Sequence, residues 1–198
     1  MVEQESAREA IAPGRRRSIQ AHQAILQATR DELEEVGYRD MTIEGIAARA
    51  GVGKKTIYRW WPSKAALALE VLAASPGEYA PFSDTGSLKE DLLAYFEYSF
   101  AGLQGKFGTV LSGLAAEAQL DPEFAHEFQQ VFIVPRKKGL VALLQQAVQR
   151  GELAADTNLE VLADLIYGAK WYRFLLYPAP LDAAFAREIV EIIMRLSK

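Results

Sequence analysis

Apolar residues recur along this chain with the three- and four-residue spacing of amphipathic helices. The first such stripe consists of Ile19, Ile25, Leu26, Thr29, Leu33 and Val36. It predicts a helix over residues 18–36, and Gly37 is a typical residue just past a helix end. Alternation of apolar and polar residues, which is typical of strands, never extends beyond a few positions. We therefore expect an all-α protein of about eight to ten helices.

Capping residues and prolines define the remaining helices. Ser, Thr and Asp side chains accept hydrogen bonds from the free N–H groups at a helix start. Such residues precede apolar stretches at Thr42, Ser63, Ser87, Asp121 and Asp182. The expected helices cover residues 43–50, 54–61, 64–74, 88–103, 107–119, 122–150, 158–177 and 183–196. Pro135 should kink or divide the long helix, because proline lacks the N–H that a helix interior needs.

One stretch predicts a domain boundary. Residues 75–86 contain two prolines and two glycines, which favour a linker over regular structure. We therefore expect a flexible basic arm over residues 1–17 and a first domain over residues 18–74, which includes a connecting helix over 63–74. A larger helical domain would then cover residues 75–198.

The segment 42–64 predicts a helix-turn-helix. The apolar face of its first helix is formed by Ile43, Ile46, Ala47 and Ala50. Ile57 and Trp61, four residues apart, are expected to be the buried stripe of its second helix. Two helices that cross steeply need a small side chain at their closest approach and a permissive backbone at the turn. Ala47 and Gly51 meet these two needs, so duplex DNA is the leading partner.

The charge of this segment supports contact with DNA. Between Arg49 and Lys64 every charged residue is Lys or Arg. The second helix is expected to present outward Lys54, Lys55, Thr56, Tyr58 and Arg59. Cationic side chains neutralise phosphates, and threonine, tyrosine and arginine also bind phosphate oxygens or base edges. The alternative is a solvated cationic face on an ordinary helical protein.

The distribution of charge changes what the net charge implies. The chain of 198 residues has a net charge of −4, which taken alone argues against nucleic acid. Residues 14–64 hold ten Lys and Arg against six Asp and Glu, a net charge of +4. Residues 67–198 hold eleven against seventeen, a net charge of −6. A basic head on an acidic body orients its head toward a polyanion.

The sequence offers little for catalysis or metal binding. It has no cysteine, so disulfides, thiolate nucleophiles and thiolate metal sites are excluded, which fits a reducing cytoplasm. His22 and His126 are the two histidines, and neither a G-x-S-x-G nor an H-E-x-x-H motif occurs. A group of carboxylates, interpreted as surface and capping residues, comprises Glu117, Asp121, Glu123 and Glu127. We expect no enzyme, no bound metal and no cofactor.

Targeting and membrane segments are also not expected. Residues 1–13 carry several charges and no apolar run, so they do not resemble a secretory signal. The longest charge-free stretch, residues 18–29, is much shorter than the roughly 20 apolar residues that span a bilayer. We expect a cytoplasmic, nucleoid-associated protein without a membrane partner.

Residues 25–64 resemble the DNA-binding domain of the tetracycline-repressor (TetR/AcrR-like) family of regulators. The features that carry the resemblance are a glycine after Val36, the Thr42 cap, the Ala47/Gly51 turn, Ile57-Tyr58, Trp60-Trp61 and Pro62-Ser63-Lys64. The rest of the chain matches as an all-helical body, and its stretch RGELAADTNLEVLADLIYG resembles the segment before the family's dimerisation helices.

This resemblance implies both a fold and a mode of action. The fold is an N-terminal three-helix helix-turn-helix DNA-binding domain plus a larger helical ligand-binding and dimerisation domain. The function is a repressor that binds a near-palindromic operator as a homodimer and is released by a small, mostly apolar effector. A dimer places two half-sites about 34 Å apart, whereas a single short helix reads few base pairs. The alternatives are a DNA-organising protein without an effector and a helical enzyme.

The resemblance also assigns DNA contacts to matching positions. Those on the recognition helix are Lys54, Lys55 and Thr56 at its start and Tyr58 and Arg59 on its groove-facing side. Thr42 and Lys64 match positions that commonly hold phosphates at helix N-termini. Arg15–Arg17 match only as a basic arm, for which a minor-groove contact and a disordered, non-specific tail both stay open.

The larger domain is rich in aromatic residues. As a set they predict an apolar effector pocket lined by Tyr95, Phe96, Phe100, Phe128, Phe132, Trp171 and Tyr172. Ordinary core packing is the alternative for each of them. Lys170 and Arg173 could pair with an acidic ligand, although we expect both to be exposed to solvent.

The last two predicted helices provide the expected dimer interface. Its residues are Leu162, Leu165, Ile166, Ile189 and Ile193. Gly168 and Ala169 would allow close approach of helices, and the same pair of helices from a second chain would complete a four-helix packing. The alternative is that these residues belong to the core of one chain.

Overall fold

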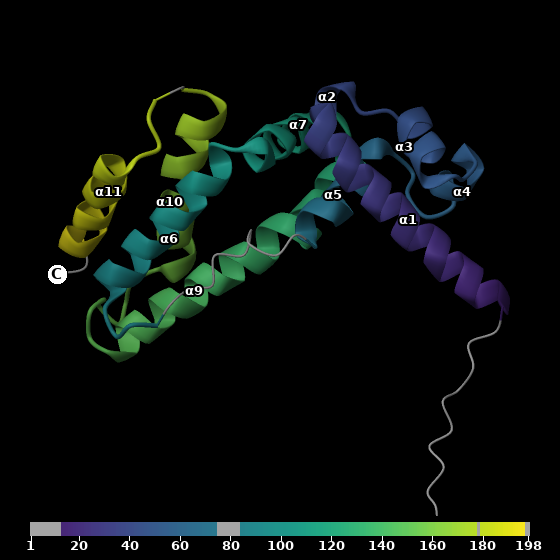
Figure 1. Ribbon diagram of the computed structural model, residues 1–198. Coiled ribbons are helices and arrows are strands. Elements are labelled where there is room, and N and C mark those ends of the chain that lie inside the picture. The colour runs from purple at the N-terminus through teal and green to yellow at the C-terminus, as the bar shows by residue number, and fades with distance from the viewer. Residues whose placement is uncertain (1–12, 75–83, 178, 197–198) are drawn as a thin grey trace, which may run out of the picture.

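A computed structural model describes residues 13–74, 84–177 and 179–196. Every regular element in these ranges is helical, which confirms the predicted all-α class. The N-terminal helices lie at one end of the molecule and the C-terminal helices at the other (Figure 1). None of the helices in these ranges combines the length and the apolar content that crossing a membrane requires.

The head, residues 13–74, contains the predicted helix-turn-helix. Its helices are α1 (Pro13–Glu35), α2 (Gly37–Asp40), α3 (Ile43–Ala50), α4 (Lys54–Tyr58) and α5 (Lys64–Ala73). Helix α1 packs against both α3 and α5. The predicted stripe of α1 is buried at Ile25, Thr29 and Leu33. The Thr29 hydroxyl donates to the Ile25 carbonyl oxygen at 2.8 Å, so this polar group is satisfied within the core.

The start of α1 differs from the prediction. The helix begins at Pro13, whose fixed φ and missing N–H suit the first turn. Arg15–Arg17 therefore belong to a helix and not to a flexible arm. Residues 1–12 of the expected arm and residues 75–83 of the expected linker lie outside the described residues.

The end of α4 also differs from the prediction. The helix ends at Tyr58 and not at residue 61. The N–H groups of Trp60 and Trp61 both donate to the Ile57 carbonyl oxygen, at 2.9 and 3.0 Å. This shared acceptor tightens the chain into a turn just before Pro62, which cannot continue a helix.

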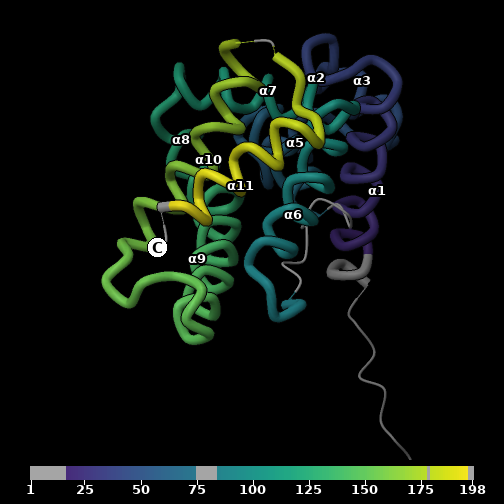
Figure 2. The backbone as a smooth tube through the Cα atoms, turned by 90° about the vertical axis from the view of Figure 1, so that its left-hand side faces the viewer, coloured from purple at the N-terminus to yellow at the C-terminus, as the bar shows by residue number. Residues whose placement is uncertain are grey.

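The body, described from Asp84 onward, contains the remaining helices. They are α6 (Leu88–Leu103), α7 (Lys106–Leu120), α8 (Pro122–Phe128), the π-helix η1 (Gln129–Ile133), α9 (Val134–Gln149), α10 (Leu159–Leu175) and α11 (Ala183–Leu196). The expected caps Ser87, Asp121 and Asp182 each accept a hydrogen bond from a backbone N–H in the following turn. Helix α11 lies at the end of the body away from the head and faces the viewer in Figure 2.

The long helix expected around Pro135 is divided by η1. In a regular helix the proline ring would clash with the carbonyl group four residues earlier, and proline offers no N–H to bond it. The Val134 N–H donates to the Gln129 carbonyl oxygen, which is the five-residue spacing of a π-helix. The extra residue in this turn accommodates Pro135 without breaking the rod that α8, η1 and α9 form together.

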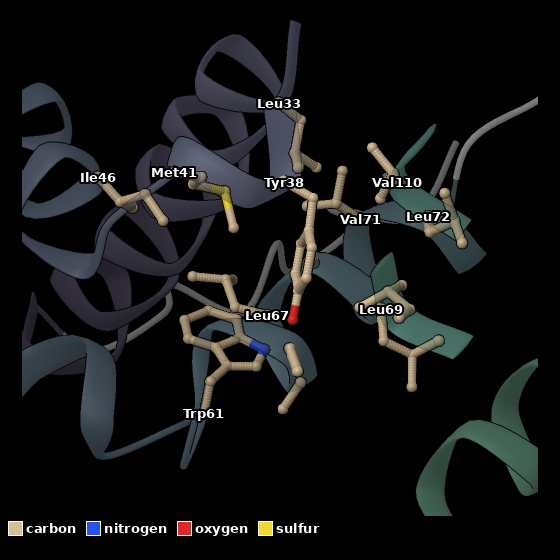
Figure 3. Packing of buried hydrophobic residues seen from close by; sticks show 14 of the residues in the cluster. Leu33, Tyr38, Met41, Ile46, Trp61, Leu67, Leu69, Val71, Leu72 and Val110 are labelled. Atoms are coloured by element: carbon tan, nitrogen blue, oxygen red, sulfur yellow. The ribbon is translucent and has the colours of Figure 1, made fainter. Parts of the chain in front are cut away.

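The head and the body share one hydrophobic core. Its labelled members in Figure 3 include Met41, Leu67 and Val110, which come from the head and from α7. The body contributes Val110, Leu111 and Leu114 from α7, Phe124 and Phe128 from α8, and Phe132 from η1. Helix α5 is buried on most sides because it lies between α1 and these body helices. A second core joins α6, α9, α10 and α11 at the far end of the body.

A close contact holds α7 against the head. Tyr38 of α2 is buried and lies directly over Gly113 of α7. A Cβ atom built on Gly113 would lie 2.4 Å from the Tyr38 Cδ1 atom, far inside van der Waals contact. The absence of a side chain at residue 113 therefore allows α2 and α7 to approach each other.

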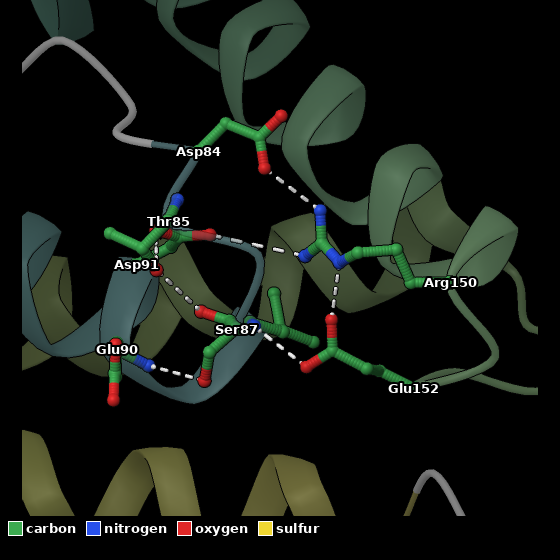
Figure 4. Close-up of polar contacts among 8 residues, drawn as sticks. Asp84, Thr85, Ser87, Glu90, Asp91, Arg150 and Glu152 are labelled. Atoms are coloured by element: carbon green, nitrogen blue, oxygen red, sulfur yellow. Dashed lines mark hydrogen bonds and ion pairs between the residues drawn. The ribbon is translucent and has the colours of Figure 1, made fainter.

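A polar cluster joins the start of α6 to the end of α9 (Figure 4). Asp91 is fully buried and accepts hydrogen bonds from the Thr85 N–H at 2.9 Å and the Thr85 hydroxyl at 2.8 Å. Arg150 lies 3.9 Å from the Asp91 carboxylate and also pairs with Asp84 at 2.9 Å and Glu152 at 2.6 Å. One guanidinium thus pairs with three carboxylates, one of them buried.

We expect Arg150→Met to lower the free energy of unfolding, because it leaves the buried Asp91 carboxylate without its counter-charge. Arg195→Met is the matched control, since Arg195 and Glu191 form an exposed pair at 3.6 Å and should contribute less than about 1 kcal/mol. Urea denaturation at neutral pH measures both values. Equal stability of the two variants would contradict this role for Arg150.

Candidate DNA interface and ligand pocket

The turn between α3 and α4 has the predicted construction. Gly51 ends α3 with φ 65° and ψ 33°, the left-handed conformation that favours glycine. The Val52 N–H donates back to the Ala47 carbonyl oxygen at 3.0 Å, and the Ala47 side chain is buried at the crossing. Thr42 caps α3 by accepting the Gly45 N–H at 3.0 Å. The two helices are therefore held at a defined angle by local interactions.

Helix α4 presents the side chains that were predicted to face outward. Lys54, Lys55, Tyr58 and Arg59 are exposed, and Tyr58 retains 53% of its accessible surface. Ile57 and Trp61 are buried, as predicted, and the neighbouring Thr56 is half-buried. Helix α4 lies at the end of the molecule away from α11 (Figure 1).

Two of the cations in this segment are paired within the head. Arg49 binds Glu32 at 3.2 Å and Glu35 through both guanidinium nitrogens, and this hydrogen bonding lowers the pKa of Glu35. Lys54 lies 2.7 Å from a Glu44 carboxylate oxygen, and this hydrogen bond raises the pKa of Lys54. These carboxylates lie outside segment 49–64, so the sequence pattern of that segment did not reveal the pairing.

Lys55 of α4 and Arg59, which follows this helix directly, carry the remaining positive charge of residues 54–59. In the part of the chain that the structure describes, neither residue forms an ion pair with a carboxylate. The Arg59 guanidinium lies 4.6 Å from the centre of the Trp60 ring, which orients it without neutralising it. These two side chains are the best placed of the predicted set to meet a phosphate or a base edge.

The two tryptophans attach the end of the recognition helix to its neighbours. Trp61 Nε1 donates to Glu70 of α5 at 2.6 Å, and the same carboxylate lies 3.6 Å from His22 Nε2 of α1. The His22 ring lies 5.3 Å from the Trp60 ring and 4.7 Å from the Trp61 ring, between centroids. The position of α4 is therefore coupled to both α1 and α5.

Lys64, predicted to contact a phosphate, forms hydrogen bonds within the head. Its Nζ donates to the carbonyl oxygens of Tyr38, Arg39 and Met41, at 3.1, 3.2 and 3.3 Å. These carbonyl groups are left free at the end of α2, where a cation is favoured. All three donors of the ammonium group have protein partners, so Lys64 contributes to the stability of the head, and its phosphate contact stays a prediction.

The body contains a cavity of about 1020 Å³ between α6, α7, α8, η1, α9 and α10. Five of the seven predicted pocket residues line it, namely Tyr95, Phe128, Phe132, Trp171 and Tyr172. Phe96 and Phe100 do not, because they lie on the opposite side of α6, and Phe100 stacks on Phe185 of α11 at 5.9 Å. The sequence pattern of α6, apolar nearly all round, could not distinguish its two sides.

Lys170 corrects a second expectation, because it is only 8% exposed and not solvated. Its Nζ donates to the Tyr95 hydroxyl at 2.8 Å and the Ser99 hydroxyl at 2.9 Å, at the wall of the cavity. Burial, and to a lesser extent the positive charge of Arg136, lowers the pKa of Lys170 to about 7. Arg173 lies outside the pocket lining and donates to the Pro180 carbonyl oxygen at 2.8 Å.

Comparison with known families identifies both parts of the chain. Residues 25–71 match the family described as bacterial regulatory proteins, tetR family. Residues 82–193 match the tetracyclin repressor-like C-terminal domain. This chain belongs to the TetR family of transcriptional regulators. The resemblance found in residues 25–64 is therefore confirmed, and the family match extends over the body.

Individual TetR-family relatives align over most of their length. The uncharacterized HTH-type transcriptional regulator YdeS of Bacillus subtilis is 36% identical over 177 residues, which is 89% of each chain. The DNA-binding transcriptional repressor TetR of Mycobacteroides abscessus is 29% identical over 93% of this chain and 95% of its own. The crystal structure of the TetR family transcription regulator SCO0332 matches with a TM-score of 0.77 at 30% identity, over 89% of this chain and 97% of that one. The relatives are named as regulators of transcription and not as enzymes.

The expected dimer interface of this TetR-family chain needs correction. Four of its five predicted residues, Leu162, Ile166, Ile189 and Ile193, are buried in the core of the protomer and have little surface left for a partner. Leu165 is 59% exposed. Val161, Gly168 and Tyr172 are exposed on the same side of α10, at helical spacing, and a Cβ atom built on Gly168 would meet open space. Both sides of α10 carry apolar residues, so their spacing could not show which side faces the core. The predicted interface residues of α10 lie mostly on the side that does.

We expect Lys64→Met to destabilise the protein by about 1–3 kcal/mol, because three backbone carbonyl groups lose a charged donor. Lys55→Met is the control and should change stability by less than about 0.5 kcal/mol, since Lys55 is exposed. Thermal unfolding followed by circular dichroism compares the two variants. An unchanged melting temperature for Lys64→Met would argue against the structural role of Lys64.

Proposed function

We propose that this protein is a ligand-responsive repressor that binds a palindromic operator as a homodimer and leaves it when a small, mostly apolar effector fills the body cavity. One observation carries this proposal. Leu111, Phe128 and Phe132 line the cavity and also belong to the core that the body shares with the head. An effector that displaces these side chains acts on the packing that orients the helix-turn-helix.

The contacts around α5 and α7 provide a path for this effect. Helix α5 packs against α7, α8 and η1, and α7 also packs against α2 across the Tyr38–Gly113 contact. Trp61 ties the end of α4 to Glu70 of α5. A shift of α7 or η1 thus changes the position of α4 in each protomer and the separation of the two recognition helices. Operator half-sites are spaced by about 34 Å, so a changed separation weakens binding to both at once.

The DNA contacts of the proposal divide by charge and exposure. Lys55, Tyr58 and Arg59 enter the major groove, where arginine and lysine read guanine and tyrosine contacts bases or phosphates. Thr42, Lys54 and Thr56 lie at the helix starts and bind the phosphate backbone. Glu44 competes with phosphate for Lys54, so Lys54 contributes less than Lys55.

The homodimer of the proposal forms through the exposed side of α10. Val161, Leu165 and Tyr172 offer apolar surface, and Gly168 allows another helix to approach closely. Ile192 of α11 is also an exposed apolar residue, at 57%. An isologous contact of α10 and α11 with the same helices of a second chain buries these residues in a four-helix packing.

The decisive experiment measures binding to the DNA that flanks the protein's own gene. Fluorescence anisotropy should show affinity for a duplex from this region that falls steeply with salt, and footprinting should show protection of an inverted repeat. Fractionated small-molecule extracts should then release the DNA. Salt-sensitive binding that no extract releases would favour the DNA-organising alternative, and absence of any such binding would refute the proposal.

Arg59→Ala and Lys55→Ala should each weaken operator binding by about 1–3 kcal/mol and reduce the preference for the operator over unrelated DNA. Lys54→Ala should have a smaller effect, because its ammonium already pairs with Glu44. Lys89→Ala, at an exposed site on α6, is the control and should not change affinity. Anisotropy titrations with operator and scrambled duplexes give both quantities. Equal losses for Arg59→Ala and Lys89→Ala would exclude α4 as the reading helix.

Leu165→Glu should raise the dissociation constant of the dimer at least about tenfold, because association would bury a carboxylate in an apolar contact. Leu120→Glu is the matched control, since Leu120 is an apolar residue of α7 that is 82% exposed. Analytical ultracentrifugation over a concentration series measures both variants. A dimer that tolerates Leu165→Glu as well as Leu120→Glu would place the interface elsewhere.

A further inference from the structure

We infer that the body cavity selects organic anions: molecules with a carboxylate or sulfonate head, which Lys170 and Arg136 hold, and an apolar body that the aromatic wall surrounds. This inference names the chemical class of the effector and rests on the proposed function only in taking this cavity as the effector site. It follows from the kinds of group that line the cavity and from how they are paired.

The first observation is a buried ammonium group held by neutral partners. Lys170 extends from α10 toward α6, where both of its hydrogen-bond partners, Tyr95 and Ser99, are hydroxyls. The Tyr95 and Tyr167 rings lie 5.0 and 4.9 Å from its Nζ. Hydroxyls and ring faces compensate a buried positive charge only in part, and an anion would compensate it more fully.

The second observation is the excess of cations at the cavity wall. Arg136 of α9 lines the cavity near Lys170, with its Nη1 donating to the Phe132 carbonyl oxygen at 3.0 Å. Lys137 also lines it, but pairs with Asp164 at 2.7 Å and Glu160 at 3.0 Å. Asp164 is the single carboxylate among the described lining residues, and Lys137 neutralises it. The charge left at the wall is therefore positive.

The third observation is the apolar character of the rest of the wall. The cavity is also lined by Phe107, Leu111, Phe128, Phe132, Trp171 and Leu175. A volume of about 1020 Å³ is at the upper end of the range for drug-sized ligands. The cavity therefore suits an anion whose body is a fused ring system or a hydrocarbon chain.

Protonation of Lys170 should follow binding. Its pKa is lowered to about 7 by burial and by Arg136, so the amine is partly neutral near pH 7 in the free protein. The hydroxyl of Tyr95 stays neutral, because burial raises its pKa well above 10. An anion beside Lys170 favours the ammonium form and raises its pKa. Affinity for an anion is then highest below pH 7 and falls as the pH rises above 7, as each binding event must take up a proton.

The experiment compares anions with neutral molecules of the same shape. Isothermal titration calorimetry at pH 6 with the full chain uses two pairs of probes: decanoate against decan-1-ol, and 2-naphthoate against 2-naphthalenemethanol. We expect at least one anion to bind about tenfold or more tightly than its neutral partner. Lys170→Met should abolish this preference, and Lys138→Met, at an exposed site on α9, should keep it.

Two readouts on the wild-type chain decide the inference even if Lys170→Met does not fold. Equal binding of anion and alcohol in both pairs, or no binding by either anion at millimolar concentration, would overturn it. A preference that does not decline between pH 6 and pH 9 would also overturn it, because both probe carboxylates stay ionised over this range. Buffers of different ionisation enthalpy should report proton uptake near pH 7 for wild type.

The experiments distinguish a failure of the anion inference from a failure of the proposed repressor function. Operator release by a neutral extract component, with no preference for anions, would refute the anion inference and leave the repressor proposal standing. Binding of decanoate or 2-naphthoate to a chain that shows no salt-sensitive affinity for duplex DNA would refute the repressor proposal and leave the anion site standing.

Discussion

The packing of α5 and α7 against each other is the constraint on which the other parts of this structure depend. Helix α5 follows the recognition helix directly and is buried between α1 and the body helices. Helix α7 also approaches α2 so closely that the Tyr38 ring leaves no space for a side chain at Gly113. Because protein interiors are close-packed, a displacement of α7 moves its neighbours and is not absorbed by empty space. Head and body match two separate family descriptions, but they pack together as one unit.

The charges of this protein fall into those that its own fold uses and those that remain for a partner. Arg49, Lys54 and Lys64 pair with carboxylates or helix-terminal carbonyl groups inside the head. Lys55 and Arg59 keep their charge at the surface of α4. The body repeats this division in its interior, where Lys137 is neutralised by Asp164 and Lys170 meets only hydroxyls and rings. Both candidate sites are thus defined by which cations the fold leaves uncompensated.

Much of the fold could be predicted because helix signals are local. Thr42, Ser63 and Asp121 cap the helices they precede, and Gly51 adopts the conformation that the turn requires. The family resemblance of the head rests on the same short-range features, and the family match over residues 25–71 confirms it. The shorter α4 was not predictable in this way, because two N–H groups share one carbonyl oxygen only once the chain is folded.

By itself the sequence determined the helical class, the helix-turn-helix and the outward side of α4, since each depends on residues within a few positions of one another. The tertiary structure alone decided which side of α6 and α10 faces inward, because both helices are apolar nearly all round and only their neighbours distinguish the sides. It also decided the partners of Lys64 and Lys170, whose contacts lie 23 residues or more away along the chain. Burial and pairing over such separations are properties of packing, and no local pattern encodes them.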